Sequence, residues 1–157
     1  MIVETEILLD KVDLDILRLM QENARISNAD LARELNMAPG LERVKKLEQK
    51  HVILQYTTRL NPAPLQQKLL AFVFMKAADG LGCSTTGKEL AKIPEVQEVH
   101  HIAGEDCYLV KIRTADSASL MALMRNQFSK LKNILSTRTI IVLETVKEQQ
   151  QLIIPEK

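Results

Sequence analysis

The run SNADLARELNMAPGLERVKKLEQK, residues 27–50, constrains the fold more than any other part of the chain. Ser27 and Asp30 form an S-x-x-D capping pattern, and apolar residues follow at helical spacing from Leu31 onward. Pro39 is compatible with a helix only in its first turn, where its missing N–H has no intrahelical partner. The pattern therefore predicts two short helices joined by a tight turn.

The second of these helices is expected to have a basic outer side. Gly40, Val44 and Leu47 recur at i, i+4 and i+7 and should face inward, while Asn36 is expected to cap the helix. The outer arc then holds Ala38, Pro39, Glu42, Arg43, Lys45, Lys46 and Gln49. This arrangement is typical of a helix-turn-helix, whose second helix enters the DNA major groove. An ordinary helical pair with solvated charges fits the periodicity and the charge equally well.

Charge is unevenly distributed along the chain, although the formal net charge is only +1. Residues 1–34 carry four basic and eight acidic side chains, whereas residues 43–59 carry five basic and one acidic. A local basic excess on and after the second helix predicts contacts with phosphates of double-stranded DNA. Because the overall charge is weak, we expect binding to depend on this patch being repeated in an oligomer.

Composition indicates a globular protein, with 46% hydrophobic and 26% charged residues. No apolar run approaches the roughly 20 residues that span a bilayer, and the acidic N-terminus does not resemble a targeting segment. Cys83 and Cys107 do not form a disulfide framework. We therefore expect a cytoplasmic protein that does not enter a membrane.

Asp13 is expected to cap a first helix, so that three helices occupy residues 13–50. The following HVILQYTTRLN, residues 51–61, is rich in β-branched and aromatic residues and predicts a wing or short strand. The Asn61-Pro62-Ala63-Pro64 sequence breaks regular structure. It divides the chain into a DNA-binding domain, residues 1–61, and a second domain, residues 62–157.

The second domain is predicted to contain four strands and two helices. The strands are expected at residues 69–77, 96–103, 107–114 and 134–146. Ser84 or Thr85 should cap the first helix, and Asp116 or Ser117 the second. The order strand, helix, strand, strand, helix, strand is the ferredoxin-like βαββαβ pattern, so the fold class is α+β. The long apolar strands carry more hydrophobic surface than two helices cover, which predicts a homodimer.

The sequence lacks the catalytic signatures and metal-ligand spacings that mark common enzyme sites. His100 and His101 are adjacent on a predicted strand, so their side chains should point to opposite faces. The turn Gly104-Glu105-Asp106 carries two carboxylates and free backbone groups, which suit the two charged ends of a zwitterion. A solvated hairpin turn is the alternative interpretation.

Five segments in a characteristic order resemble the leucine-responsive and asparagine-responsive (Lrp/AsnC) regulator family. They are DLDIL at 13–17, RISNADLA at 25–32, LERVKKLE at 41–48, LNP at 60–62 and TRT at 137–139. The resemblance covers nearly the whole chain. It implies a winged helix-turn-helix joined to a ferredoxin-like effector domain. It also implies dimers that assemble further, often into octamers, with amino acids bound between dimers.

Two departures from the family pattern bear on function. Leu35-Asn36-Met37 stands where the family often has L-S-P. The effector turn, commonly G-D-x-D-Y, here reads Gly104-Glu105-Asp106-Cys107-Tyr108, so Cys107 replaces the carboxylate before the tyrosine.

These observations define two candidate sites. In the first, Arg43, Lys45 and Lys46 contact phosphates or bases, while Ser27, Asn28 and Asn36 fix the backbone register. The expected DNA-binding set is Ser27, Asn28, Asn36, Ala38, Pro39, Glu42, Arg43, Lys45 and Lys46. The expected effector-binding set is Gly104, Glu105, Asp106, Cys107, Tyr108, Ser136 and Thr137.

The lining near the effector turn is aliphatic, which favours leucine or methionine over a charged amino acid; no other cofactor and no metal is expected. The predicted function is a transcriptional regulator that is not an enzyme. Two alternatives are a sirohaem-decarboxylase-like enzyme using His100 and His101, and an architectural DNA-binding protein that has no effector.

Overall fold

The computed structural model describes residues 6–38, 41–80 and 84–156, so Pro39, Gly40 and Cys83 lie outside the described residues. The chain divides into two compact units, Met1–Arg59 with Glu148–Lys157, and Leu60–Lys147. Within the described residues, no helix is both long and apolar enough to cross a membrane.

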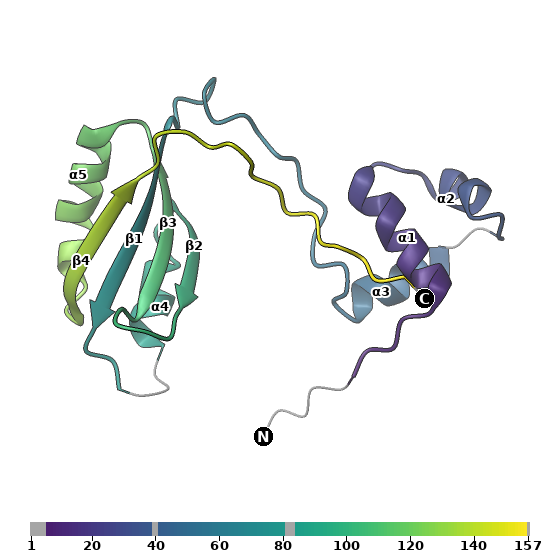
Figure 1. Ribbon diagram of the computed structural model, residues 1–157, viewed down its shortest axis with the longest axis horizontal. Coiled ribbons are helices and arrows are strands. Elements are labelled where there is room, and N and C mark those ends of the chain that lie inside the picture. The colour runs from purple at the N-terminus through teal and green to yellow at the C-terminus, as the bar shows by residue number, and fades with distance from the viewer. Residues whose placement is uncertain (1–5, 39–40, 81–83, 157) are drawn as a thin grey trace. The chain divides into compact units, whose positions relative to one another are not determined.

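The N-terminal unit is built on three helices: α1 Lys11–Glu22, α2 Asn28–Glu34 and α3 Leu41–Gln49 (Figure 1). Its core is apolar and contains side chains from all three helices, namely Ile16, Leu31, Val44 and Leu47. The predicted inward face of α3 is confirmed for Val44 and Leu47, which are 5% and 2% exposed. The arrangement confirms the helix-turn-helix prediction.

The helix caps differ from the prediction at two positions. Asp10, not Asp13, is the N-cap of α1, and Asp13 occupies the third helical position and completes a capping box. Ser27 caps α2 as predicted, because its hydroxyl accepts a hydrogen bond from the Asp30 N–H at 3.0 Å. Asn36 has φ of 49° and follows the C-cap of α2, so it ends that helix instead of capping α3. Asparagine tolerates this left-handed conformation better than most residues.

The segment predicted as a wing or short strand is not a strand, because residues 51–68 of the described chain contain no regular strand. A strand needs a ladder partner, and none of the described residues supplies one for this segment. Tyr56 is instead tied back to α3, because its hydroxyl donates to Glu48 Oε1 at 2.8 Å.

The C-terminal tail, Glu148–Lys157, contacts α1 and groups with the first unit by its contacts. The Gln21 side-chain amide forms two reciprocal hydrogen bonds with the Leu152 backbone, at 2.6 Å and 2.8 Å. Arg59 and Glu148 form an ion pair at 3.3 Å. These contacts join residues that are far apart in the sequence, and the hydrophobic periodicity of the sequence does not predict such contacts.

The second unit is a four-stranded antiparallel sheet of β1 Leu69–Ala77, β2 Val96–His101, β3 Tyr108–Thr114 and β4 Ile134–Ile141. The strand order is β2-β3-β1-β4. Two helices and a 3₁₀ turn complete the unit: α4 Thr85–Leu90, α5 Ser117–Asn126 and η1 Phe128–Lys130. This topology confirms the ferredoxin-like prediction. Ser84 is the N-cap residue of α4 but makes no side-chain cap bond, whereas Asp116 caps α5.

The sheet has one covered face and one open face. Residues of α4 and α5 pack with Ala71, Val73 and Met75 of β1 in a single core. Side chains alternate along a strand, so the neighbours of these residues point to the opposite, open face. By register the open face carries Phe72, Phe74, Lys76, Leu109, Lys111, Arg113, Ser136, Arg138 and Ile140.

Strand β4 ends at Ile141, five residues before the predicted end at Val146. Its partner β1 begins at Leu69, and the last bond between the two segments runs from the Val142 N–H to the Leu70 carbonyl. Residues 143–146 lie beyond the start of β1 and find no strand to pair with in the described parts of the chain. Their apolar sequence therefore continues without strand hydrogen bonds.

Candidate DNA-binding and effector sites

The exposed side of α3 carries the lysines Lys45 and Lys46 together with the carboxylates of Glu42 and Glu48. Lys45 and Lys46 are exposed, and Lys45 lies 4.0 Å from Glu42 Oε1, a separation at the limit of an ion pair. Among the described residues no ion-pair partner is found for Lys46. A flexible lysine ammonium at such a position is suited to a phosphate contact.

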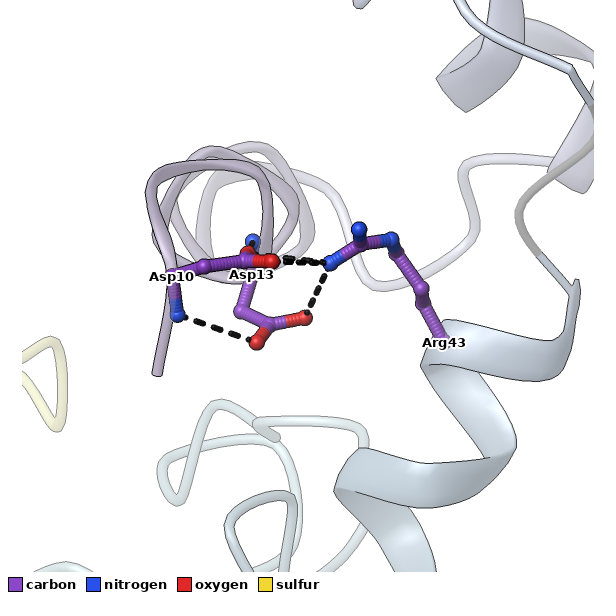
Figure 2. A network of polar contacts seen from close by, with 3 residues as sticks. All are labelled: Asp10, Asp13 and Arg43. Carbon is purple, nitrogen blue, oxygen red and sulfur yellow. Dashed lines mark hydrogen bonds and ion pairs between the residues drawn. The ribbon is translucent and has the colours of Figure 1, made fainter. Parts of the chain in front are cut away.

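Arg43 is oriented differently from the prediction. Figure 2 shows its side chain extending from α3 to the first turn of α1, where it meets Asp10 and Asp13. Its Nη1 atom donates to Asp10 Oδ2 at 2.7 Å and to Asp13 Oδ1 at 3.1 Å. In this structure the Arg43 guanidinium links α3 to α1, and the expected base or phosphate contact stays a prediction.

The charges in this network stabilise one another. The hydrogen bond from Arg43 is the main cause that lowers the pKa of Asp10, and the same bond raises the pKa of Arg43. The single positive charge of Arg43 offsets one of the two carboxylate charges at the start of α1, so the three groups together keep a net charge of −1.

Among the remaining predicted DNA-binding residues, Ser27 and Asn28 begin α2, whereas Asn36 and Ala38 lie between α2 and α3. Ser27, Asn28, Asn36 and Ala38 are all exposed, although the Ser27 hydroxyl already serves as a cap.

In the second unit, the predicted effector turn joins β2 to β3. Gly104 has φ of +145°, a conformation that side chains disfavour, and no atom lies within 4 Å of an ideal Cβ built on it. Gly104 and Glu105 are exposed. The Ile102 N–H donates to the Cys107 carbonyl at 2.9 Å and closes the hairpin.

Asp106 is paired with a residue that was not in the predicted site. Arg138 Nη2 on β4 donates to Asp106 Oδ2 at 3.2 Å. The Arg138 guanidinium also lies over the Phe74 ring, with its Cζ atom 4.3 Å from the ring centroid. One residue each from β4, β1 and the turn therefore meet on the open face.

Cys107 and Tyr108 point away from the exposed side of the turn. The Ala77 N–H donates to Cys107 Sγ at 3.4 Å, so the thiol is bound to β1. Tyr108 is only 1% exposed, and its ring stacks on His101 at a centroid distance of 5.0 Å. Both side chains are therefore engaged with β1 or with the core, and their role in effector binding stays a prediction.

The Tyr108 hydroxyl is held by Asp79, the residue two positions after β1. Tyr108 Oη donates to Asp79 Oδ2 at 2.9 Å, and the Thr86 hydroxyl donates to Asp79 Oδ1 at 2.6 Å. Asn133 Nδ2 donates to Asp79 Oδ1 at 3.1 Å. These donors, led by the Thr86 hydroxyl, lower the pKa of Asp79. The carboxylate thus ties together the ends of β1 and the starts of α4, β3 and β4.

Ser136 and Thr137 are neighbours on β4 whose side chains leave the strand in opposite directions. Ser136 pairs in register with Lys76 and Thr137 with Met75, so their side chains point to opposite faces. Both residues line an open pocket of about 270 Å³ formed with α5 and η1, whose other lining residues include Phe128, Leu131 and Ile134. The pocket and the effector turn lie at the same end of the sheet but on different strands.

The two adjacent histidines have separate partners. His100 lies 2.9 Å from Glu98 Oε1, and His101 stacks on Tyr108. In the described parts of the chain, no group of three or more His, Cys, Asp or Glu side chains is arranged to hold a metal ion.

Sequence reasoning missed three residues that organise these sites, namely Asp10, Asp79 and Arg138. The DKVD spacing at residues 10–13 is itself a capping-box signal that identifies Asp10. Arg138 lies in the TRT segment, but only strand register shows that it reaches Asp106. Nothing local marks Asp79.

Comparison with known proteins matches both units to described families. Residues 9–53 match a winged helix-turn-helix DNA-binding domain, and residues 70–152 match the Lrp/AsnC ligand-binding domain. The leucine-responsive regulatory proteins of Klebsiella pneumoniae and Escherichia coli strain K12 are each 35% identical over 150 residues, which cover 93% of this chain and 92% of theirs.

Solved structures with the same fold include two methionine complexes. A transcriptional regulator from Neisseria meningitidis, solved with L-methionine, has a TM-score of 0.84 and 26% identity, covering 93% of this chain and 97% of that one. A feast or famine regulatory protein from Mycobacterium tuberculosis, complexed with L-methionine, has a TM-score of 0.85 and 28% identity, covering 94% and 100%.

Proposed function

Because this chain belongs to the Lrp/AsnC family of transcriptional regulators, we propose that it binds double-stranded DNA through α3 and responds to leucine or methionine. The observation that carries the proposal is the pairing of a helix-turn-helix bearing exposed lysines with a separate ligand-binding unit. In this proposal the chain works in the cytoplasm.

At the DNA, Lys45 and Lys46 act as phosphate contacts, and Asn28, Asn36, Ala38 and Glu42 lie along the approach to the groove. Arg43 has a different role, because its guanidinium is committed to Asp10 and Asp13. It sets the angle between α1 and α3.

At the effector turn, Gly104, Glu105 and Asp106 form the polar side of the amino-acid site, with Ser136 on the open face beside them. Two observations support an apolar ligand. Phe74 and Leu109, which are cross-strand neighbours, line the open face near the turn. Two structural relatives were solved with L-methionine.

The protein acts as a homodimer that assembles further, and the octamer is our preferred assembly. The open face of the sheet supports this, because Phe72 is only partly buried there and its neighbour Ile140 is 44% exposed. Removing such an apolar surface from water favours association.

A thermal-shift screen of the full chain against the twenty common amino acids tests the effector proposal. We expect the largest rise in melting temperature with methionine or leucine, because a ligand that binds only the folded state stabilises it. A larger rise with lysine, arginine or aspartate would overturn the choice of ligand. No shift with any amino acid, together with DNA binding, would favour the architectural protein.

A further inference from the structure

The C-terminal tail is attached to α1 by a clasp, which is the pair of hydrogen bonds between the Gln21 side chain and the Leu152 backbone. Gln21 Nε2 donates to the Leu152 carbonyl at 2.8 Å, and Gln21 Oε1 accepts from the Leu152 N–H at 2.6 Å. One turn earlier on α1, Arg18 Nη2 lies 3.5 Å from the Pro155 carbonyl oxygen. Glutamine suits this clasp, because its amide carries a donor and an acceptor and so matches both polar groups of a backbone residue.

The clasp is polar, and it can open without exposing a buried apolar surface at Leu152 or Ile153. These two side chains are already 76% and 99% exposed. Opening the clasp exchanges hydrogen bonds within the protein for hydrogen bonds with water, which is a small net change. The tail therefore has two accessible arrangements, attached to α1 or released from it.

The tail is a direct continuation of the strand that carries part of the proposed effector site. The Val142 N–H makes the last backbone bond from this strand to β1. Only residues 143–147 separate it from the tail, and such a short segment has little slack. At its start the tail is also paired with the segment after α3, because Glu148 lies 3.3 Å from Arg59. A displacement of β4 therefore pulls on the tail and on the clasp.

The other end of α1 is joined to the helix that carries the exposed lysines. Asp10 and Asp13 at the start of α1 bind Arg43 of α3 (Figure 2). Gln21 lies in the last turn of the same helix. Because a helix is a stiff element, a force on one end of α1 is felt at the other. Printed contacts and covalent bonds thus run without a break from β4 through the tail and α1 to α3.

We propose that Gln21 is a positioning residue through which the C-terminal tail transmits the state of the effector-binding unit to α1 and α3. The clasp is closed in one effector state and open in the other, so the orientation of α3 follows the effector. Neither the DNA nor the amino acid needs to touch Gln21. This inference rests on the proposed amino-acid response and deepens it, because it assigns the coupling of the two units to the tail.

DNA titrations of the full chain, with and without the amino acid, test this role. The parent and two variants are titrated against a duplex enriched from a random pool, without ligand and with L-methionine or L-leucine. In Gln21→Met the new side chain has a similar length and helix propensity but lacks the amide, and no charge changes. Gln149→Met, the same substitution at an exposed glutamine of the tail, is the matched control.

The measured quantity is the ratio of the DNA dissociation constants with and without the amino acid. In the parent this ratio should differ from unity by roughly five-fold or more, as is usual for coupled sites. In Gln21→Met it should approach unity, although the variant still binds DNA and, by isothermal titration calorimetry, still binds the amino acid. Gln149→Met should keep the parental ratio. A purely structural role for Gln21 would lower the melting temperature and leave the ratio unchanged.

Amide hydrogen exchange shows whether the clasp forms and opens. The Leu152 N–H should exchange more slowly in the parent than in Gln21→Met, and its protection in the parent should change when the amino acid binds. The Val110 N–H, on a strand that is paired on both sides, is the control and should exchange equally in the two proteins. Equal exchange of the Leu152 N–H in the two proteins would overturn the clasp.

The outcomes separate this inference from the proposed function. If the parent binds no amino acid, or binds DNA equally with every amino acid tested, the proposed function fails and this inference fails with it. If the parent responds and Gln21→Met keeps the parental ratio, only the role of Gln21 is overturned. Circular dichroism checks that the variant folds. Gln21→Ala also lacks the amide and favours a helix, so it must reduce the same ratio if Gln21→Met does not fold.

Discussion

Arg43 lies on the helix that should face DNA, yet its guanidinium is bound by two carboxylates of α1. An arginine at this position of the helix indicated a DNA contact, but the carboxylates of the neighbouring helix α1 bind its side chain. A guanidinium surrounded by acids is drawn away from phosphate and holds the two helices together.

The salt dependence of DNA binding distinguishes the two roles. Lys46→Ala should reduce the slope of log affinity against log salt by roughly 1, because one phosphate contact is lost. Arg43→Ala should leave the slope unchanged and lower the free energy of unfolding by about 1 kcal/mol. Fluorescence anisotropy at several salt concentrations measures the slope, with Lys88→Ala in the second unit as the control. A slope reduced equally by Arg43→Ala would show that Arg43 contacts phosphate.

Asp79 gives a pH-dependent prediction. Its pKa is lowered in the folded protein, chiefly by the Thr86 hydroxyl, so the charged form favours folding. The stabilisation is complete above the unfolded pKa near 3.8 and is lost as pH falls through the lower folded pKa. Asp79→Asn should therefore reduce stability at pH 7, by about 1–3 kcal/mol, and the difference from the parent should shrink below pH 4. Urea unfolding at several pH values measures this, and a difference that grows in acid would contradict it.

At the scale of the element, the alternation of side chains along a strand predicts which face each residue occupies, and the predicted effector set did not take this into account. Tyr108, Val110 and Ile112 alternate in the sequence, and all three are buried. The same period of two separates Ser136 from Thr137, so their opposite directions also follow from the sequence. Strand β1 was predicted with its observed bounds, because a continuous apolar run marks a central strand.

Other features depend on contacts between elements and have no local signal. The end of β4 depends on the length of β1, and the pairing of Arg138 with Asp106 depends on register across two strands. The attachment of the tail to α1 depends on the Gln21 amide, which reaches a residue 131 positions away.

The contact between α4 and β3 is tight enough to predict the result of adding one methyl group. An ideal Cβ on Gly87 would lie 2.8 Å from Tyr108 Cε1, so Gly87→Ala should push α4 away from the sheet. We expect a loss of about 1–3 kcal/mol, which outweighs the roughly 1 kcal/mol that alanine gains in a helix. Gly80→Ala is the control, because nothing lies within 4 Å of its ideal Cβ. Thermal denaturation compares the two variants. Equal melting temperatures would show that the Tyr108 ring can move aside without a loss of stability.

At the scale of the whole molecule, the open face of the sheet predicts the assembly. Ile140→Lys places a charge among Phe72 and Phe74 and should shift the protein toward smaller species, because burying an unpaired charge is unfavourable. Met121→Lys is the control, since Met121 is similarly exposed, at 49%, but lies on α5. Light scattering at micromolar concentration measures the mass. A parent protein that is a stable monomer would contradict the proposed dimer.

The central claim is that DNA binding by the first unit responds to an amino acid bound by the second. Its most direct test is a titration of the full chain against a duplex enriched from a random pool, with and without L-methionine or L-leucine. We expect a cooperative complex whose affinity falls steeply with salt and whose affinity or stoichiometry changes with the amino acid. A salt-insensitive complex, or one that is identical in every amino acid tested, would contradict the account.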